Sequence, residues 1–337
     1  MKKIMNKAED YVDDMLKGIY AAHPHEVTYV NKDLRCFVAK ATPGKKGKVG
    51  IMSGGGSGHL PLFLGFVGEG ILDGAAVGGV FQSPSGKQIY EITKAINNGA
   101  GVLYVYGNYN GDILNFEMST EMAEMDDIET LHTVVAEDVF SSPKGAENKR
   151  RGVAGMFFAF KLAGAAAEKM MPLQEVKRIA DKTCANMRTV GMALTPCIVP
   201  ELGKPSFNLA EDEMEIGMGV HGEPGISRTK MAKSDEIVDQ MLNPILEDLP
   251  YKAGDEVAVL MNSLGATPKD ELYIMYKRVD EILKAKKISV YHVYIGEFAT
   301  SMEMAGSSIT LLKLDSELKS LLAAPANSTS FVQMQLG

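Results

Sequence analysis

The sequence predicts an α/β protein of two domains, with mostly parallel or mixed sheets covered by helices. Apolar segments typical of buried strands alternate along the chain with segments of helical periodicity, as expected for helix-covered sheets. Glycine-rich turns follow two of the predicted strands. The 337 residues, 45% of them hydrophobic, are long for one domain and sufficient for two cores.

The first half of the chain begins with a helix and then alternates strands with helices. Strands are predicted at residues 36–39, 49–53, 102–106 and 130–135. Helices are predicted at residues 10–22, 62–70, 87–97, 115–125, 155–170 and 172–186. This order favours a parallel sheet with helices on its faces.

The second half repeats the same kind of alternation. Strands are predicted at residues 190–198, 256–261, 288–294 and 308–314, and helices at 234–249 and 269–284. We place the boundary near Arg188, which gives domains of residues 1–188 and 189–337.

Charge and hydropathy exclude several classes of partner. The net charge of −8 argues against nucleic acid and against an anionic membrane, since both need a clustered basic face. Lys45, Lys46 and Lys48 form a short basic run that we interpret as a solvated hairpin. No stretch reaches the roughly 20 apolar residues of a membrane-spanning helix, and no secretory signal is present, so a cytoplasmic protein is expected.

The cysteines and four of the histidines are interpreted as structural. Cys36, Cys184 and Cys197 are odd in number and widely spaced, which predicts reduced thiols, mostly in the core. The spacing of His23, His25, His132 and His292 supplies no converging ligands, so no metal site is expected.

A glycine run follows the strand predicted at residues 49–53. Gly54-Gly-Gly-Ser-Gly-His-Leu-Pro61 is followed by an apolar segment that we interpret as a helix. Backbone N–H groups in such a loop could bind an anion or a hydroxyl-rich ligand, or the run could simply be a structural turn. The spacing fails the dinucleotide, Walker and nucleophile-elbow patterns, so no nucleotide site is recognisable in this chain.

Two further polar residues lie in segments suited to binding. Asp112 comes soon after the strand predicted at residues 102–106, where α/β sheets bind ligands, although it could equally cap the following helix. His221 lies in Gly217-Met-Gly-Val-His-Gly-Glu-Pro-Gly225, a segment too rich in glycine for helix or strand. Such a loop presents the imidazole for chemistry, or the histidine merely fills a turn.

Five motifs together resemble the signature blocks of the dihydroxyacetone kinase K subunit family. They are Gly54-Gly-Gly-Ser-Gly-His59-x-Pro61, Phe81-x-Ser83-Pro-Ser85, Asn108-Tyr-x-Gly-Asp112-x-x-Asn115-Phe116, Arg151-Gly-Val-Ala-Gly155 and Gly217-Met-Gly-x-His221-Gly-Glu-Pro-Gly225. They occur in this order over residues 54–225, about half the chain, and the set is far more specific than any single block.

The resemblance implies a homodimeric, two-domain subunit that binds a short ketose such as dihydroxyacetone covalently, as a hemiaminal on His221. It implies that His59 and Asp112 form the acid–base pair. The substrate-binding residues implied in this way are Gly54, Gly55, Gly56, Ser57, Gly58, His59, Ser83, Asp112 and His221. Glu223 could orient the imidazole or be an exposed loop charge. The family further implies that ADP or ATP with Mg²⁺ is bound by a separate L subunit, which a phosphotransferase-system protein rephosphorylates in some bacteria.

Three positions depart from the pattern of this family. Leu60 stands where a polar residue is common, Phe63 stands where a second histidine is common, and Gly107 stands where a lysine is common. We therefore expect a pocket that is more apolar at one wall and lacks one cation. Two alternatives follow: a kinase subunit for a larger ketose such as erythrulose, or a ketose-sensing co-activator of a transcription regulator. A nucleotide-binding α/β enzyme is a third, weaker interpretation of the glycine run alone.

Overall fold

The computed structural model describes residues 2–42 and 44–337, and its contacts divide the chain into two compact units. The first unit comprises Met1–Val135, Met156–Thr183 and Leu318–Gly337, and the second comprises Ala136–Gly155 and Cys184–Glu317. The sequence predicted one domain boundary near Arg188, whereas the chain passes between the two units several times. Segment Ala136–Gly155 joins the second unit because buried Asp248 there binds the guanidinium of Arg150 as well as that of Arg188.

The C-terminal segment belongs to the first unit for a similar reason. Strand β14 (Ala326–Ser328) pairs with β4 (Gly68–Glu69) and with β15 (Val332–Gln333) in a small antiparallel sheet. The chain therefore returns to its first core after completing the second, which no local pattern of the sequence indicates.

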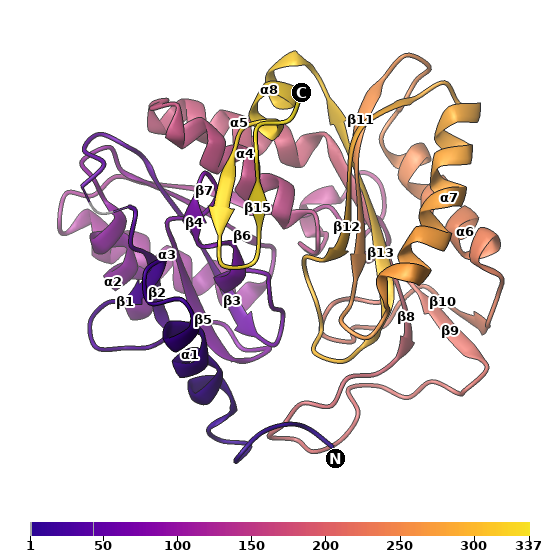
Figure 1. Cartoon of the computed structure of the whole chain (residues 1–337), viewed down its shortest axis with the longest axis horizontal. Helices are drawn as coiled ribbons and strands as arrows, with labels where there is room; N and C mark the ends of the chain where they lie inside the picture. The colour runs from indigo at the N-terminus through magenta and orange to yellow at the C-terminus, as the bar shows by residue number, and fades with distance from the viewer. Residues whose placement is uncertain (1, 43) are drawn as a thin grey trace. The chain divides into compact units, whose positions relative to one another are not determined.

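The first unit is built on a six-stranded sheet in the order β1-β2-β5-β3-β6-β7. Its strands are β1 (Val27–Tyr29), β2 (Cys36–Ala39), β3 (Gly50–Ser57), β5 (Gly74–Val80), β6 (Val102–Gly107) and β7 (Thr130–Val135). Its helices are α1 (Tyr11–Ala22), the 3₁₀ turn η1 (Leu64–Phe66), α2 (Gly86–Ile96), α3 (Asn110–Glu124), α4 (Met156–Glu168), α5 (Leu173–Ala185) and α8 (Ser316–Leu322). Strands β5, β3, β6 and β7 run parallel, and β1 and β2 extend the sheet antiparallel (Figure 1).

Helices cover both faces of this first sheet. Apolar side chains of α2 and α3 pack with strand residues such as Met52 and Tyr104 in one buried cluster. Gly55 points to the other face, where it meets the ring of Phe63, and Phe63 lies against Phe160 of α4. The predicted α/β class is confirmed for this half of the chain.

The second unit has a mixed sheet in the order β10-β9-β8-β13-β11-β12. The strands are β8 (Met187–Thr195), β9 (Glu213–Ile216), β10 (Ser227–Lys230), β11 (Glu256–Ser263), β12 (Ser289–Glu297) and β13 (Ala305–Leu314). Two helices lie side by side and share the core with one face of this sheet: α6 (Ser234–Asp248) and α7 (Lys269–Ala285) (Figure 1). The unit also contains two short 3₁₀ turns, η2 (Val139–Ser141) and η3 (Glu147–Lys149). Strands β11 and β12 pair in parallel and the other pairs of this sheet are antiparallel, so the sheet is mixed and helix-covered, and the predicted α/β class is confirmed here as well.

Two predictions around the glycine run are wrong. Strand β3 continues to Ser57, so three of the glycines lie in the strand and not in a loop. The helix predicted at residues 62–70 is absent: this segment holds η1 and β4, and Phe63 has a left-handed φ of 68°. Its apolar residues mimic helical spacing because they are buried on several sides.

The basic run is also not a plain solvated hairpin. Lys48 is only 2% exposed, and its ammonium group lies 2.6 Å from a carboxylate oxygen of buried Asp73. Asp73 in turn accepts bonds from the hydroxyl of Thr42 and from the backbone N–H of Ile51. Pairing within the unit thus removes this lysine from the surface, in line with the rule that buried charges are paired.

Other predictions from composition agree with the structure. All three cysteines are free thiols, and Cys36 and Cys197 are buried. Within the described residues, no helix combines the length and the apolar character that crossing a membrane requires.

Candidate functional site

Three predicted site residues follow adjacent parallel strands of the first unit. Ser83 comes after β5, His59 after β3 and Asp112 after β6, so the strand order brings them to one edge of the sheet. From β3 the chain continues to β5 on one side, and from β6 it continues to β7 on the other side. Such a reversal is a topological switch point, the place where open α/β sheets form their ligand crevice.

The glycines before His59 allow close packing of the backbone. A Cβ on Gly54 would lie 2.7 Å from the carbonyl oxygen of Ala76, and one on Gly56 would lie 2.7 Å from Cα of Phe81. A Cβ on Gly55 would lie 2.5 Å from the ring of Phe63. The missing side chains of these glycines therefore leave room for neighbouring backbone and for an aromatic ring. The run is followed by η1 and β4, so the predicted helix N-terminus that would bind an anion is not formed here.

His59 lies between two aromatic rings and is almost fully buried. Its ring stacks on Phe81 with centroids 4.9 Å apart and meets Phe63 edge-on at 6.5 Å. Phe63 and Phe81 both have positive φ, 68° and 58°, which is uncommon for bulky residues and is retained only where the surroundings require it. His59 is 3% exposed, so packing against these rings restricts its position.

Asp112 lies inside the first turn of α3 and is not the cap of that helix, which is Tyr109. Its carboxylate is 6% exposed and close to the positive end of the helix, a favourable place for an anion. Asn115 joins two helix starts: its amide donates to the carbonyl of Gly111 at 2.8 Å and its oxygen accepts from Gly86 N–H at 2.9 Å.

The serines of the predicted site lie in the same region. The space that a Cβ on Gly111 would occupy is 2.6 Å from the hydroxyl oxygen of Ser83, which places Ser83 beside the start of α3. Ser57 donates its hydroxyl to the carbonyl of Gly78 at 2.8 Å, and its own carbonyl accepts from Phe81 N–H. The Ser57 hydroxyl thus already links β3 to the end of β5.

His221 lies in the second unit, in the loop of the β9–β10 hairpin. The two flanking strands were not predicted, but the loop between them was. Gly222, directly after the histidine, has a left-handed φ of 85°, which a glycine adopts without strain. The side chain of His221 is 25% exposed, so solvent and small molecules can reach the ring.

Glu223 orients the imidazole, which decides between the two sequence interpretations of this residue. One carboxylate oxygen lies 2.8 Å from Nδ1 of His221, and the other accepts the backbone N–H of His221 at 2.9 Å. Burial alone would raise the pKa of Glu223, but the bonds from His221 lower it to about 2. A carboxylate that holds a proton on Nδ1 places the lone pair of the neutral imidazole on Nε2.

An arginine holds the base of the same loop. Arg151 donates from Nη2 to the carbonyl of Gly217 at 2.8 Å and from Nε to Asp138 at 2.9 Å. Burial raises the pKa of Asp138 to about 6 although Arg151 opposes this change. The sequence signal for this clamp was the block Arg151-Gly-Val-Ala-Gly155, to which no role could be given without the fold.

The glutamate before that aspartate is also buried. One oxygen of Glu137 accepts the N–H groups of Val153 and Gly155, at 3.0 and 2.8 Å, while the other has no hydrogen-bond partner among the described residues. Burial raises the pKa of Glu137 to about 7. The segment carrying Arg151 is thus fixed on both sides by buried carboxyl groups.

Comparison with known families agrees with the order of these motifs. Residues 17–330 match the family model described as the Dak1 domain, which includes all five blocks. The chain belongs to the Dak1 family. A relative from Listeria innocua, named PTS-dependent dihydroxyacetone kinase 2, dihydroxyacetone-binding subunit DhaK, is 45% identical, and the match covers 98% of this chain and 99% of that protein. A Mycolicibacterium smegmatis member named D-erythrulose kinase is 38% identical, and the match covers 98% of this chain and 56% of that protein.

Solved structures of Dak1 proteins resemble the chain over nearly its full length. The dihydroxyacetone kinase of C. freundii superposes with a TM-score of 0.90 at 29% identity, covering 98% of this chain and 60% of that one. A dihydroxyacetone kinase operon co-activator, Dha-DhaQ, superposes with a TM-score of 0.88 at 31% identity, covering 97% of this chain and 99% of that one. The Dak1 fold is therefore common to kinases and to a co-activator.

Proposed function

We propose that this chain is the dihydroxyacetone-binding subunit of a dihydroxyacetone kinase, acting with a separate nucleotide-bearing L subunit. The main support is the near full-length match to the Listeria innocua DhaK subunit. His59, Asp112 and His221 all stand at the motif positions that bear the chemistry in this family. The proposal includes a homodimer in the cytoplasm, and an L subunit that carries ADP or ATP with Mg²⁺.

In this proposal His221 binds the ketose covalently. Nε2 attacks the carbonyl carbon, the C=O π electrons move to oxygen, and the oxygen takes up a proton to give a hemiaminal. The carboxylate of Glu223, 2.8 Å from Nδ1, stabilises the positive charge that develops on the ring and then accepts or relays the Nδ1 proton. Glycerol has no carbonyl and is rejected at this step.

Asp112 and His59 act on the terminal hydroxyl of the trapped ketose. The buried carboxylate of Asp112 accepts the hydroxyl proton as the oxygen attacks phosphorus, and His59 shares the hydrogen bond. Fixing the substrate on His221 turns the transfer into a step on a ketose that is already bound. The glycine run and the rings of Phe63 and Phe81 would then form the wall against the ketose.

A second candidate function is a ketose-sensing co-activator. Gly107 favours it, because the family's usual lysine is missing and a Cβ there would lie 3.0 Å from the ring of Tyr109 and 3.4 Å from the sulfur of Met156. The co-activator Dha-DhaQ shares the fold at 31% identity. A kinase subunit for a larger ketose is a variant of the first proposal, supported by the relative named D-erythrulose kinase and by the apolar Leu60 and Phe63.

One experiment with three variants tests these roles. The full chain is incubated with ¹³C-carbonyl dihydroxyacetone or erythrulose, and the adduct is read by NMR and by intact mass at low temperature. Turnover is measured with a cognate L subunit and either ATP or a phosphotransferase-system donor. We expect His221→Ala to lose the adduct, and Asp112→Asn to keep the adduct while turnover falls about 10²- to 10⁴-fold. His25→Ala, an exposed histidine, is the control and should match the wild type.

The alternatives give different results in the same assay. An adduct that forms on the wild type without turnover of any small ketose would favour the sensor and contradict the kinase proposal. An adduct that persists in His221→Ala would overturn the role of this histidine. If both adduct formation and turnover were greater with erythrulose than with dihydroxyacetone, erythrulose would be identified as the substrate.

A further inference from the structure

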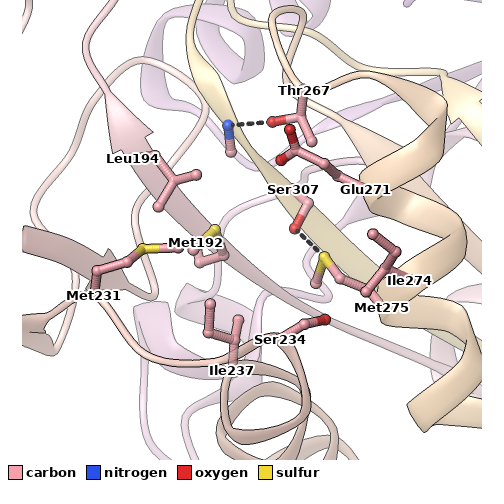
Figure 2. A pocket seen from close by; sticks show the side chains of 11 residues that line it. Met192, Leu194, Met231, Ser234, Ile237, Thr267, Glu271, Ile274, Met275 and Ser307 are labelled. Carbon is pink, nitrogen blue, oxygen red and sulfur yellow. Dashed lines mark hydrogen bonds between the residues drawn. The ribbon is translucent and has the colours of Figure 1, made fainter.

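The second unit contains a cavity of about 130 Å³ that the proposed chemistry does not use. It lies between strands β8 and β13 on one side and helices α6 and α7 on the other (Figure 2). Its apolar lining consists of Met192, Leu194, Met231, Ile237, Ile274 and Met275. Three thioethers from different sides of the cavity, those of Met192, Met231 and Met275, give a soft, adaptable lining that suits a small hydrocarbon group.

The cavity is on the opposite side of the sheet from the His221 loop. The carbonyl of Gly191 accepts Gly217 N–H at 2.7 Å, and a Cβ on Gly191 would point toward the carbonyl of Met218, so this position of β8 faces the loop. Successive residues of a strand face opposite sides, and the next residue, Met192, lines the cavity. The cavity is therefore a separate place and not an extension of the ketose site.

Two hydroxyl groups in the cavity are poorly paired. Oγ of Ser234 is buried and has no hydrogen-bond partner among the described residues. Oγ of Ser307 donates to the sulfur of Met275, at 3.3 Å, and a thioether is a weak acceptor. A buried hydroxyl without a good partner costs about 1–3 kcal/mol, so a ligand that supplies a polar atom here would recover that free energy.

Volume and charge narrow the class of ligand. An engineered cavity of roughly 150 Å³ holds the six carbons of benzene, so about six non-hydrogen atoms fit here and a seventh would extend into the entrance. The exposed carboxylate of Glu271 is part of the lining and disfavours an anion. We propose that this cavity binds a small neutral alcohol or phenol, with its hydrocarbon part among the methionines and its hydroxyl paired with Ser234.

Phenol is the probe, and methyl NMR of the full chain with ¹³C-methyl methionine is the measurement. Saturable shifts are expected for Met192, Met231 and Met275, with a Kd of about 1 mM or tighter. Toluene should shift the same signals, and benzoate should not. Ser234→Ala should weaken phenol about tenfold and leave toluene unchanged.

A pair of neighbouring variants tests the location. Ile274 is 54% exposed at the lining of the cavity, so Ile274→Trp should fold and abolish the phenol shifts by closing the entrance. Tyr273→Trp, at 58% exposure and outside the lining, should leave them intact. The absence of saturable shifts up to about 10 mM phenol, or their persistence in Ile274→Trp, would overturn the site. Binding of benzoate as tight as that of phenol would overturn the ligand class.

Discussion

The two proposed reactive histidines are held in different ways. His59 is 3% exposed and is positioned by the rings of Phe63 and Phe81, whereas the side chain of His221 is 25% exposed and is positioned by hydrogen bonds and charge. A close-packed side chain is sensitive to changes in the volume of its neighbours. A side chain held by a hydrogen-bonded network is sensitive to the loss of a charge or a hydrogen bond. The position of His59 should therefore be sensitive to added atoms, and that of His221 to lost charges.

The difference fits the two proposed roles. A covalent anchor must admit a ketose and release it, so its ring needs access and a partner that keeps one nitrogen nucleophilic. A residue that shares a proton on a fixed hydroxyl needs a constant position more than access. The loop of His221 meets its requirement through Glu223 and Arg151, both of which form hydrogen bonds to it.

The largest effect is expected for Gly56→Ala, which adds one methyl group beside His59. Its Cβ would lie 2.7 Å from Cα of Phe81 and 2.8 Å from the N atom of Gln82, and backbone atoms cannot rotate away. We expect the free energy of unfolding to fall by about 3 kcal/mol. Chemical denaturation measures this, and Gly18→Ala, which has no atom within 4 Å of its added Cβ, is the control.

A second glycine sharpens this test. In Gly55→Ala the clash is with the ring of Phe63, at 2.5 Å, so the double variant Gly55→Ala with Phe63→Leu should recover part of the lost stability. Gly56→Ala should gain nothing from Phe63→Leu. Equal stability of Gly56→Ala and the wild type would show that packing does not fix this region.

A smaller effect is expected for Glu223→Gln in the second unit. The amide keeps its shape but replaces a charge-assisted bond to Nδ1 of His221 with a neutral one, which is roughly half as strong. The rate of adduct formation should fall about 10- to 100-fold with little change in the free energy of unfolding. Stopped incubation with ¹³C-ketose gives the rate, and Glu211→Gln, an exposed charge before β9, is the control. If the free energy of unfolding fell by as much as the activation free energy of adduct formation rose, Glu223 would be a structural residue only.

Sequence reasoning found what is local in these sites and missed what is distant. The motif around His221 and the position of Asp112 near a strand end could be read directly because each depends on a few neighbouring residues. The Arg151 bond to Gly217 spans 66 positions, and that of Lys48 to Asp73 spans 25. Neither of these two contacts produces a periodic pattern in the sequence.

The wrong helix at residues 62–70 has a related cause. Leu62, Phe63, Leu64 and Phe66 have the apolar density of a helix, yet all are buried in an irregular segment. The ring of Phe63 occupies space that Gly55 leaves open, so the identity of each residue depends on the other. Hydrophobic periodicity describes one helix or strand at a time and therefore does not reveal a contact such as that between Gly55 and Phe63.

The smallest expected effect is a pH dependence of stability that belongs to the second unit. Burial raises the pKa of Glu137 to about 7, above the value near 4.3 of an unfolded glutamate. The folded state therefore binds its proton more tightly, and the associated stability is complete below pH 4 and is lost as the pH rises toward 7. Between pH 5 and pH 7 Glu137 should account for a loss of about 2 kcal/mol, which Glu137→Gln removes, whereas Asp138, whose pKa burial raises to about 6, leaves a smaller loss of about 1 kcal/mol in that variant.

Denaturant titrations at several pH values measure this slope. Glu147→Gln is the control in the same segment: a backbone bond from Gly145 lowers the pKa of Glu147, so that group stays charged across the whole range. A slope as steep in Glu137→Gln as in the wild type would assign the pH dependence to another group, with Asp138 beside Arg151 as the next to substitute, because burial raises its pKa to about 6.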